Sequence, residues 1–193
     1  IAEQLNVSRP SAGLLVSLYA MGVAIGAPVL TALTGKLPRT PQTLKKSLQF
    51  DESRTDLRYW SMCQNEYYSQ KVTACLHDER MVTDEDGYYI VATSLEADRP
   101  VNARPECGVN FLPWSPEGDG FSIAPGRANN VNDGYIIVRN MLPQPAFTHA
   151  VQNTTAPGDE EAVLGEYLPK GRYVSRVDFE TLGCAELRAA LTP

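Results

Sequence analysis

The chain divides into one long uncharged apolar segment and a longer region in which short apolar runs alternate with polar turns. From Ser11 to Gly35 it carries 25 residues without a charged side chain. About 20 consecutive apolar residues suffice for a helix to cross the hydrocarbon core of a bilayer. The pattern therefore predicts a transmembrane helix over residues 11–35, with a buried helix or hairpin of a soluble protein as the alternative.

Small residues within this segment favour a packing partner for the predicted helix. Gly22 and Gly26 form a GxxxG pair, which lets a second helix backbone approach closely in lipid. Pro28 predicts a bend two residues later. We therefore expect residues 11–35 to contact the lipid bilayer or another transmembrane helix.

After residue 40 the pattern changes to one typical of strands. Residues 41–56 are rich in Pro, Lys, Gln and Ser and predict a linker. Aromatic and β-branched runs between turn residues then predict strands over 57–63, 71–77, 88–93, 108–114 and 135–139. Short helices are expected over 145–151, 175–182 and 185–191, the second of them opening on a serine cap.

The predicted fold class is α+β, with one N-terminal transmembrane-like helix followed by a β-rich domain that ends in two or three short helices. The corresponding domains are residues 1–40, a linker over 41–56, and residues 57–193. The chain begins at Ile1 instead of Met, which we interpret as a processed protein or a fragment of a longer reading frame.

The charge balance bears on the class of partner. The chain carries 23 acidic and 17 basic side chains, a formal net charge of −6. Proteins bind a phosphate backbone through basic surfaces that release its counterions. We therefore expect no nucleic-acid partner.

The cysteines favour disulfides. Cys63, Cys75, Cys107 and Cys184 are widely spaced and contain no CxxC pair, so two disulfides are favoured over a zinc site. Disulfides in turn predict an exported domain in an oxidising compartment. Cys63 with Cys75 would join neighbouring strands, and Cys107 with Cys184 would tie the C-terminal end to the core. Four cysteines allow three pairings, and four reduced, buried thiols are the alternative.

The densest cluster of titratable side chains is His77-Asp78-Glu79, at the end of a predicted strand. An imidazole beside carboxylates can act as a general base or a metal ligand. Metal sites need several convergent ligands, and the sequence has only one other histidine, His149. A solvated hairpin end is the favoured interpretation, so we expect no catalytic residue, no metal site and no cofactor.

Large aromatic side chains are concentrated in and between the predicted strands. They allow two interpretations, the lining of a binding groove or the packing of the core, and the second is favoured because large aromatics dominate burial in small domains. The residues concerned are Tyr59, Trp60, Tyr67, Tyr68, Phe111 and Trp114.

The first 40 residues carry a resemblance to a known family. Residues 1–8, 12–28 and 33–39 resemble the second transmembrane helix and the following loop of major facilitator superfamily transporters, in the sugar or drug efflux permease branch. In that family the loop carries a Gly-x-Leu-Ala-Asp-Arg type motif. Gly35, Leu37 and Arg39 fall on or near it, with Arg39 where the family has Asp. The resemblance implies transmembrane transport by a protein with about ten further apolar helices, and residues after 40 contain no second run of about 20 apolar residues.

A second resemblance covers residues 59–184. They resemble uncharacterised exported domains of bacterial proteins, notably in 59–63, 112–114 and 139–143. The resemblance implies export and no particular activity.

The two halves predict opposite orientations. Basic side chains follow the predicted helix at Lys36, Arg39, Lys45 and Lys46 and would hold the C-terminal domain in the cytoplasm, whereas disulfides would place it outside. Two unrelated coding pieces joined near residues 40–50 would remove this conflict.

Three functional hypotheses follow from these patterns. The first is a membrane-tethered, exported domain that binds a partner or gives structural support without catalysis. The second is a truncated or chimeric fragment of a major facilitator superfamily transporter. The third is an exported hydrolase or metal enzyme that uses His77 and its acidic neighbours.

Overall fold

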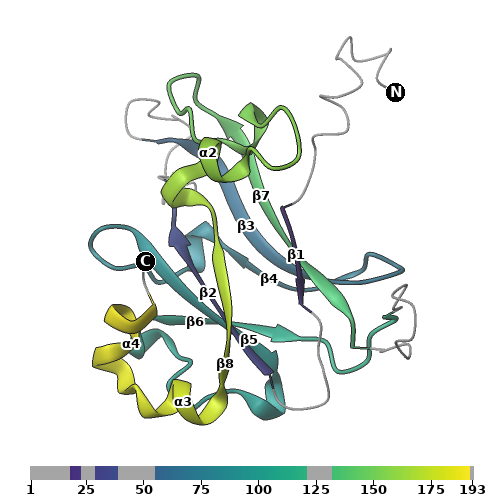
Figure 1. The fold of residues 1–193 in the computed structure, drawn as a ribbon, viewed down its shortest axis with the longest axis vertical. Coiled ribbons are helices and arrows are strands. Elements are labelled where there is room, and N and C mark those ends of the chain that lie inside the picture. Colours follow the sequence, from purple (N-terminus) through teal and green to yellow (C-terminus); the bar gives the residue numbers. More distant parts are fainter. Residues whose placement is uncertain (1–17, 23–28, 39–54, 121–131, 192–193) are drawn as a thin grey trace.

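The fold is built from two four-stranded sheets and a few short helices (Figure 1). The computed structural model describes residues 18–22, 29–38, 55–120 and 132–191. Sheet A has the strand order β1-β7-β3-β4 and sheet B the order β6-β5-β2-β8. The strands are β1 (Leu18–Gly22), β2 (Val29–Lys36), β3 (Leu57–Glu66), β4 (Val72–His77), β5 (Tyr88–Leu95), β6 (Val109–Trp114), β7 (Gly134–Pro143) and β8 (Lys170–Ser175).

Short helices lie between and after the strands. The α-helices of the described residues are α2 (Glu160–Leu164), α3 (Arg176–Thr181) and α4 (Gly183–Leu191). Single 3₁₀ turns include η2 (Asp78–Arg80), η4 (Pro105–Cys107), η5 (Val151–Asn153) and η6 (Gly165–Tyr167). Neighbouring strands run antiparallel except β5 and β6, which are parallel.

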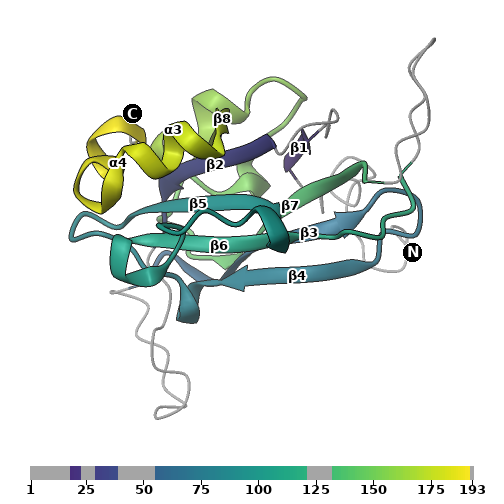
Figure 2. The ribbon, with the colours of Figure 1, turned by 90° about the horizontal axis from the view of Figure 1, so that it is seen from below.

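Two clusters of buried side chains define three layers. Leu33, Trp60 and Tyr89 belong to a cluster contributed by strands of both sheets, so this cluster fills the space between the sheets. Ala32 belongs to a second cluster with Phe179 of α3 and Leu187 of α4. Figure 2 shows α3 and α4 on one side of β2 and β5, with β3 and β4 on the other. Sheet B is therefore the middle layer, and its strands β2 and β5 are buried on both faces.

The predicted transmembrane helix over residues 11–35 is wrong, and with it the expected fold class of a membrane-spanning helix followed by a β-rich domain. Residues 18–22 and 29–36 are strands, and no helix in the described ranges combines the length and the apolar character that a bilayer span requires. β2 pairs with β5 on one side and with β8 on the other. An interior strand covered on both faces needs an almost continuous apolar sequence, which over a short window cannot be told from a buried helix.

The composition of this segment favours strands once a sheet is available. Val29, Thr31 and Thr34 of β2 are β-branched, and such residues favour strands over helices. Gly22 is the last residue of β1 and so presents no helix face, and Gly26 lies outside the described residues.

Of the strands and helices predicted after residue 56, all but one helix are confirmed. The five strands predicted after residue 56 are confirmed as β3, β4, β5, β6 and β7, and the two C-terminal helices as α3 and α4. The Ser175 hydroxyl accepts a hydrogen bond from the Asp178 amide, as a serine cap should. The helix predicted over 145–151 is wrong, because the backbone there closes separate turns, such as Phe147 N–H to the Gln144 carbonyl, that bury Phe147.

We expect Leu33→Ala to lower the free energy of unfolding by about 2–5 kcal/mol, because it opens a cavity between the two sheets. Leu33 is 3% exposed. Val177→Ala, at a residue that is 71% exposed, should change stability by less than about 0.5 kcal/mol. Urea unfolding followed by tryptophan fluorescence measures both. An unchanged midpoint for Leu33→Ala would contradict an interior β2.

Candidate functional site

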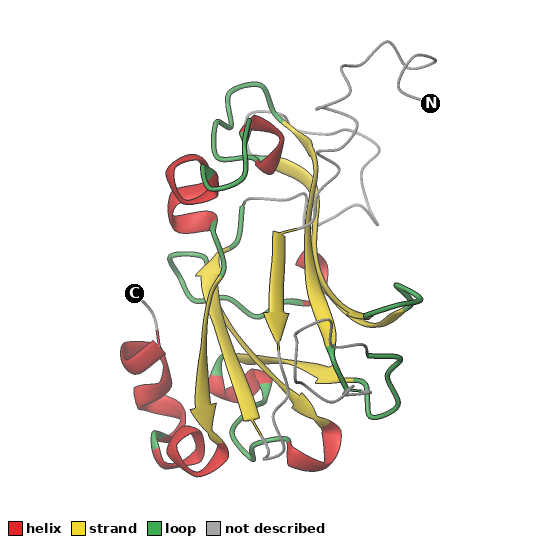
Figure 3. Cartoon of the chain, turned by 45° about the vertical axis from the view of Figure 1, so that its right-hand side comes forward, coloured by secondary structure: helices red, strands yellow, loops and turns green. Residues whose placement is uncertain are grey.

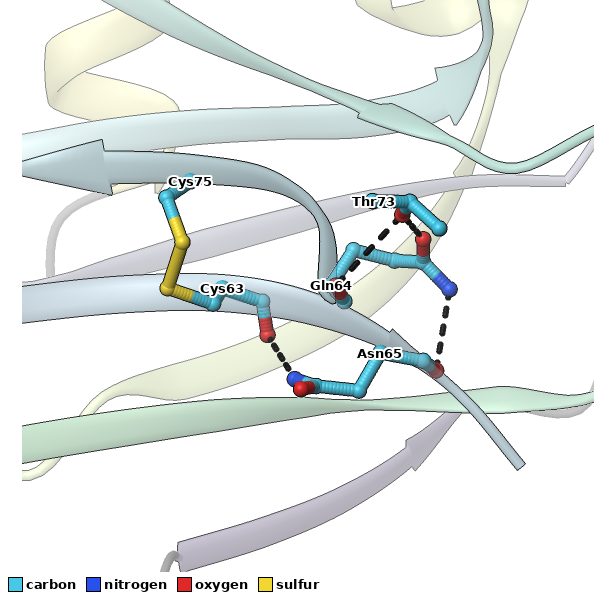
Figure 4. The surroundings of a disulfide bond; sticks show 5 residues. All are labelled: Cys63, Gln64, Asn65, Thr73 and Cys75. Atoms are coloured by element: carbon cyan, nitrogen blue, oxygen red, sulfur yellow. Dashed lines mark hydrogen bonds between the residues drawn. A yellow bond between two sulfur atoms is a disulfide. The ribbon is translucent and has the colours of Figure 1, made fainter. Parts of the chain in front are cut away.

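Both disulfides are present, in the pairing favoured from the sequence. Cys63 in β3 and Cys75 in β4 are directly opposite each other, with their Cα atoms 4.1 Å apart (Figure 4). Cys107 at the end of η4 is bonded to Cys184 in α4. The described residues contain no free cysteine, so no thiol is available there as a nucleophile. Disulfides persist in oxidising compartments, and the two bridges indicate a location outside the cytoplasm.

A buried polar network fixes the strand end beside the first disulfide (Figure 4). The Gln64 side-chain amide donates to the Asn65 carbonyl at 3.0 Å, and the Asn65 side-chain amide donates to the Cys63 carbonyl at 2.8 Å. The Thr73 hydroxyl donates to the side-chain oxygen of Gln64. The pairing of β3 with β4 shifts register between Gln64 and Asn65, so these bonds hold the irregular end of the hairpin in place.

The His77-Asp78-Glu79 cluster does not form a metal site. His77 ends β4 and is half-buried, whereas Asp78 is buried and Glu79 exposed in η2. Within the described ranges no group of three or more His, Cys, Asp or Glu side chains is placed to hold a metal ion. The other histidine, His149, has its Nδ1 2.8 Å from the Val163 carbonyl oxygen and is engaged there.

Alternation along β3 exposes an apolar pair on the outer face of sheet A, the face turned away from sheet B. Trp60 and Met62 point into the core between the sheets, so Tyr59 and Ser61 belong to the outer face. Tyr59 is directly opposite Met141 of β7. Tyr59 is 36% exposed and Met141 is 47% exposed. We call these two residues the apolar pair.

Leu142 follows Met141 in β7 and adopts an unusual backbone conformation. Its φ is +50°, in the left-handed region that bulky side chains rarely adopt, at a cost of about 1–3 kcal/mol. The residue is 62% exposed. Burial of its own side chain therefore does not offset the strain. Such strain persists where the surrounding chain requires it and is common at binding surfaces.

The next row across the same face is polar. Ser61 is directly opposite Arg139 of β7 on one side and His77 of β4 on the other. Opposed residues in antiparallel strands have Cβ atoms about 5 Å apart on one face, so the three side chains are neighbours. We call them the polar row. The Ser61 hydroxyl is buried without a hydrogen-bond partner, and no hydrogen bond or ion pair engages the side chains of Arg139 or His77 within the described residues.

A cavity of about 230 Å³ lies beside the second disulfide. Its lining includes Ile90, Cys107 and Cys184, and Arg188 and Asp84 also line it. The Arg188 Nε lies 3.1 Å from an Asp84 carboxylate oxygen, whose partner oxygen accepts two backbone N–H groups. The charges at this cavity therefore satisfy one another, and His77 does not line it.

A polar contact fastens the end of β2 to β5 and η6. The Lys36 Nζ lies 3.0 Å from one carboxylate oxygen of Glu166, and the Tyr88 hydroxyl donates to the other at 2.7 Å. The Lys36 ammonium also lies 5.6 Å from the centre of the Tyr88 ring and 5.7 Å from that of Tyr167. The hydrogen bonds from Tyr88 and Lys36 hold the pKa of Glu166 below its ordinary value, and the bond to Glu166 raises the pKa of Lys36.

Two residues of the transporter-like motif, Gly35 and Leu37, contribute to the contacts between the β2 and β5 segments. Gly35 in β2 is opposite Tyr89 of β5, and a Cβ at Gly35 would lie 2.9 Å from the Tyr89 hydroxyl oxygen, so the close approach needs glycine. Burial raises the pKa of Tyr89, which keeps the hydroxyl neutral. The Leu37 amide donates to the Gly87 carbonyl at 2.9 Å. Arg39 lies outside the described residues.

Comparison with known proteins gives one short similarity. A 39-residue segment, 20% of this chain, is 54% identical to the uncharacterised MFS-type transporter YtbD of Bacillus subtilis (strain 168). The chain spans about a tenth of that curated relative's length, since the matched segment covers 10% of it. No protein-family model and no solved structure matches the chain. The resemblance to transporters is thus supported over a 39-residue segment only.

Removing the two disulfides should have unequal effects on stability. Closure of the 77-residue separation between Cys107 and Cys184 restricts the unfolded chain by about 4.5 kcal/mol, against about 3 kcal/mol for the 12-residue separation of Cys63 and Cys75. We expect the double Cys→Ser variant at Cys107 and Cys184 to lose more stability in urea unfolding than the variant at Cys63 and Cys75. Equal losses, or the reverse order, would contradict this account.

We expect Glu166→Gln to weaken the protein by about 0.5 kcal/mol at neutral pH, the scale of a partly exposed ion pair. A lowered pKa stabilises the fold above its ordinary value of 4.5 and loses that effect as pH falls through the folded-state pKa. The difference between Glu166→Gln and the parent should therefore disappear in acid below pH 4.5. Thermal melts across pH, with Glu106→Gln as the matched control, measure it. A difference that persists in acid would exclude this cause.

Proposed function

We propose that this chain is a disulfide-stabilised domain exported from the cytoplasm, which acts by binding a partner protein through the outer face of sheet A. The apolar pair carries the proposal, since Tyr59 and Met141 leave adjacent apolar surface exposed on one face of sheet A. Tyr, Met and Arg are enriched at protein interfaces, and Arg139 occupies the row next to the apolar pair.

Binding without catalysis is favoured by the state of the reactive groups. The four cysteines are joined in two disulfides. The polar groups around Lys36 and Glu166 satisfy each other, and so do the charges of Arg188 and Asp84 at the cavity. A catalytic site needs a nucleophile or base aimed at a place where substrate can lie. We therefore do not propose a hydrolase or metal enzyme based on His77.

The similarity to YtbD favours a second candidate, a segment of an MFS-type transporter joined to an exported domain. The 39 matched residues agree in length with the resemblance of residues 1–40. Transport would then belong to a longer protein, because alternating access needs two helical bundles around a central site. In this candidate the transporter-like segment would fold as part of the exported domain, and the pairing of β2 with β5 and β8 supports that arrangement. The stability of Leu33→Ala tests whether β2 is an interior strand.

The test of the proposed function is selection of peptides that bind the oxidised, purified chain from a displayed library. We expect the selected peptides to lose affinity about tenfold or more for Met141→Ser and Tyr59→Ser, because truncation removes apolar contact area worth more than 1.4 kcal/mol. Val101→Ser, at another exposed apolar residue, should bind them as the parent does. Selection of peptides that bind Met141→Ser with parental affinity, or failure to select any, would refute a binding role for this face.

A further inference from the structure

We infer that the polar row binds a carboxylate of the partner, on a segment in which an acidic side chain adjoins an apolar one. The inference rests on the proposed function and names the chemistry that the outer face of sheet A would recognise. The polar row places a guanidinium, a hydroxyl and an imidazole side by side, at Arg139, Ser61 and His77. Each of these groups can donate a hydrogen bond to an oxyanion.

The first support is the unmet hydrogen bonding of the polar row. Ser61 is 0% exposed, and its hydroxyl lacks a partner. A buried hydroxyl without a partner is costly, and a native structure that retains one calls for an explanation. Arg139 and His77 flank it, and across the described chain no carboxylate pairs with Arg139. An incoming oxyanion would meet the exposed Arg139 first, because Ser61 has no exposed surface, and it would supply the acceptor that the Ser61 hydroxyl lacks once the flanking side chains move apart.

The second support is the geometry of the guanidinium. Arginine presents a planar fork of N–H donors that matches the two oxygens of a carboxylate. Arg139 is exposed, so its fork is open to a ligand that approaches the outer face of sheet A. The adjacent Cys63 and Ile137 are buried on one side of the row, and the apolar pair lies on the other. Once a bound segment excludes water from the row, these apolar neighbours strengthen a charge-assisted hydrogen bond.

The apolar neighbours decide the kind of carboxylate. A small inorganic anion would leave Tyr59 and Met141 exposed, whereas an apolar group beside the carboxylate would cover them. The apolar pair spans β3 and β7 next to the polar row, which suits a peptide segment with an apolar side chain beside the acidic one better than an isolated acid. The ligand is therefore a peptide segment of a partner protein, and equally tight binding of a free carboxylic acid would contradict this choice.

The experiment titrates the full oxidised chain, labelled with nitrogen-15, and follows amide shifts of β3, β4 and β7. The probes are acetyl-Leu-Glu-Leu amide, its Gln counterpart, and N-acetylleucine. We expect the Glu peptide to bind about tenfold or more tightly than the Gln peptide, since one charge-assisted contact distinguishes them. Arg139→Gln should abolish this preference and Ser61→Ala should reduce it, whereas Lys71→Gln, which removes the same charge elsewhere on the hairpin, should preserve it.

The outcomes separate the inference from the proposed function. Equal affinity of the Glu and Gln peptides, or an unchanged preference in Arg139→Gln, would overturn the carboxylate site. If Met141→Ser still weakens both peptides, the binding face stands and only its chemistry is wrong. N-acetylleucine that binds as tightly as the Glu peptide would overturn the choice of a peptide segment. Glu-peptide binding that is insensitive to Met141→Ser would remove the proposed function while leaving an anion site.

Discussion

The structure depends on the burial of β2 on both faces. Leu33 packs between the two sheets, and its neighbour Ala32 packs beneath the C-terminal helices, so one strand joins the two clusters of the core. Only uncharged residues can occupy the middle of such a strand, since an unpaired buried charge costs several kcal/mol. The charged residue of β2, Lys36, lies at its end and pairs with Glu166. The same requirement governs a membrane-spanning helix, which explains why a strand in the middle layer carries a pattern typical of bilayers. Figure 3 shows the strands of the two sheets and the C-terminal helices beside one of them.

The same ambiguity between a buried strand and a membrane-spanning helix limits how much of the fold could be predicted from the sequence. The strands β3 to β7 are recognisable in the sequence from aromatic and β-branched runs between turn residues, and α3 is recognisable from its serine cap. β8 could not be predicted, because it is an edge strand whose residues are almost all exposed and whose short apolar part is preceded by Lys170 and Arg172. β1 and β2 could not be separated from a helix, because a continuous apolar run carries no period that distinguishes the two.

The candidate site was less predictable, because it depends on register between distant segments. Sequence patterns single out His77 for its neighbours Asp78 and Glu79, yet its partner on the sheet face is Ser61, 16 positions earlier. Arg139 reaches the same row from β7, more than 60 residues further along the chain. The segments 59–63 and 139–143 stood out separately for their resemblance to exported domains. Only the pairing of β3 with β7 reveals that they form one surface.

The two disulfides support different parts of this arrangement. β4 is an edge strand with one neighbour and little burial, so packing alone specifies its register weakly. Cys63–Cys75 occupies the row next to the polar row and locks β4 to β3, which keeps His77 opposite Ser61. A slip of one residue would turn His77 to the other face of the sheet. Cys107–Cys184 instead holds α4 against sheet B and so supports the core. An oxidising compartment therefore supports both the proposed binding face and the stability of the fold.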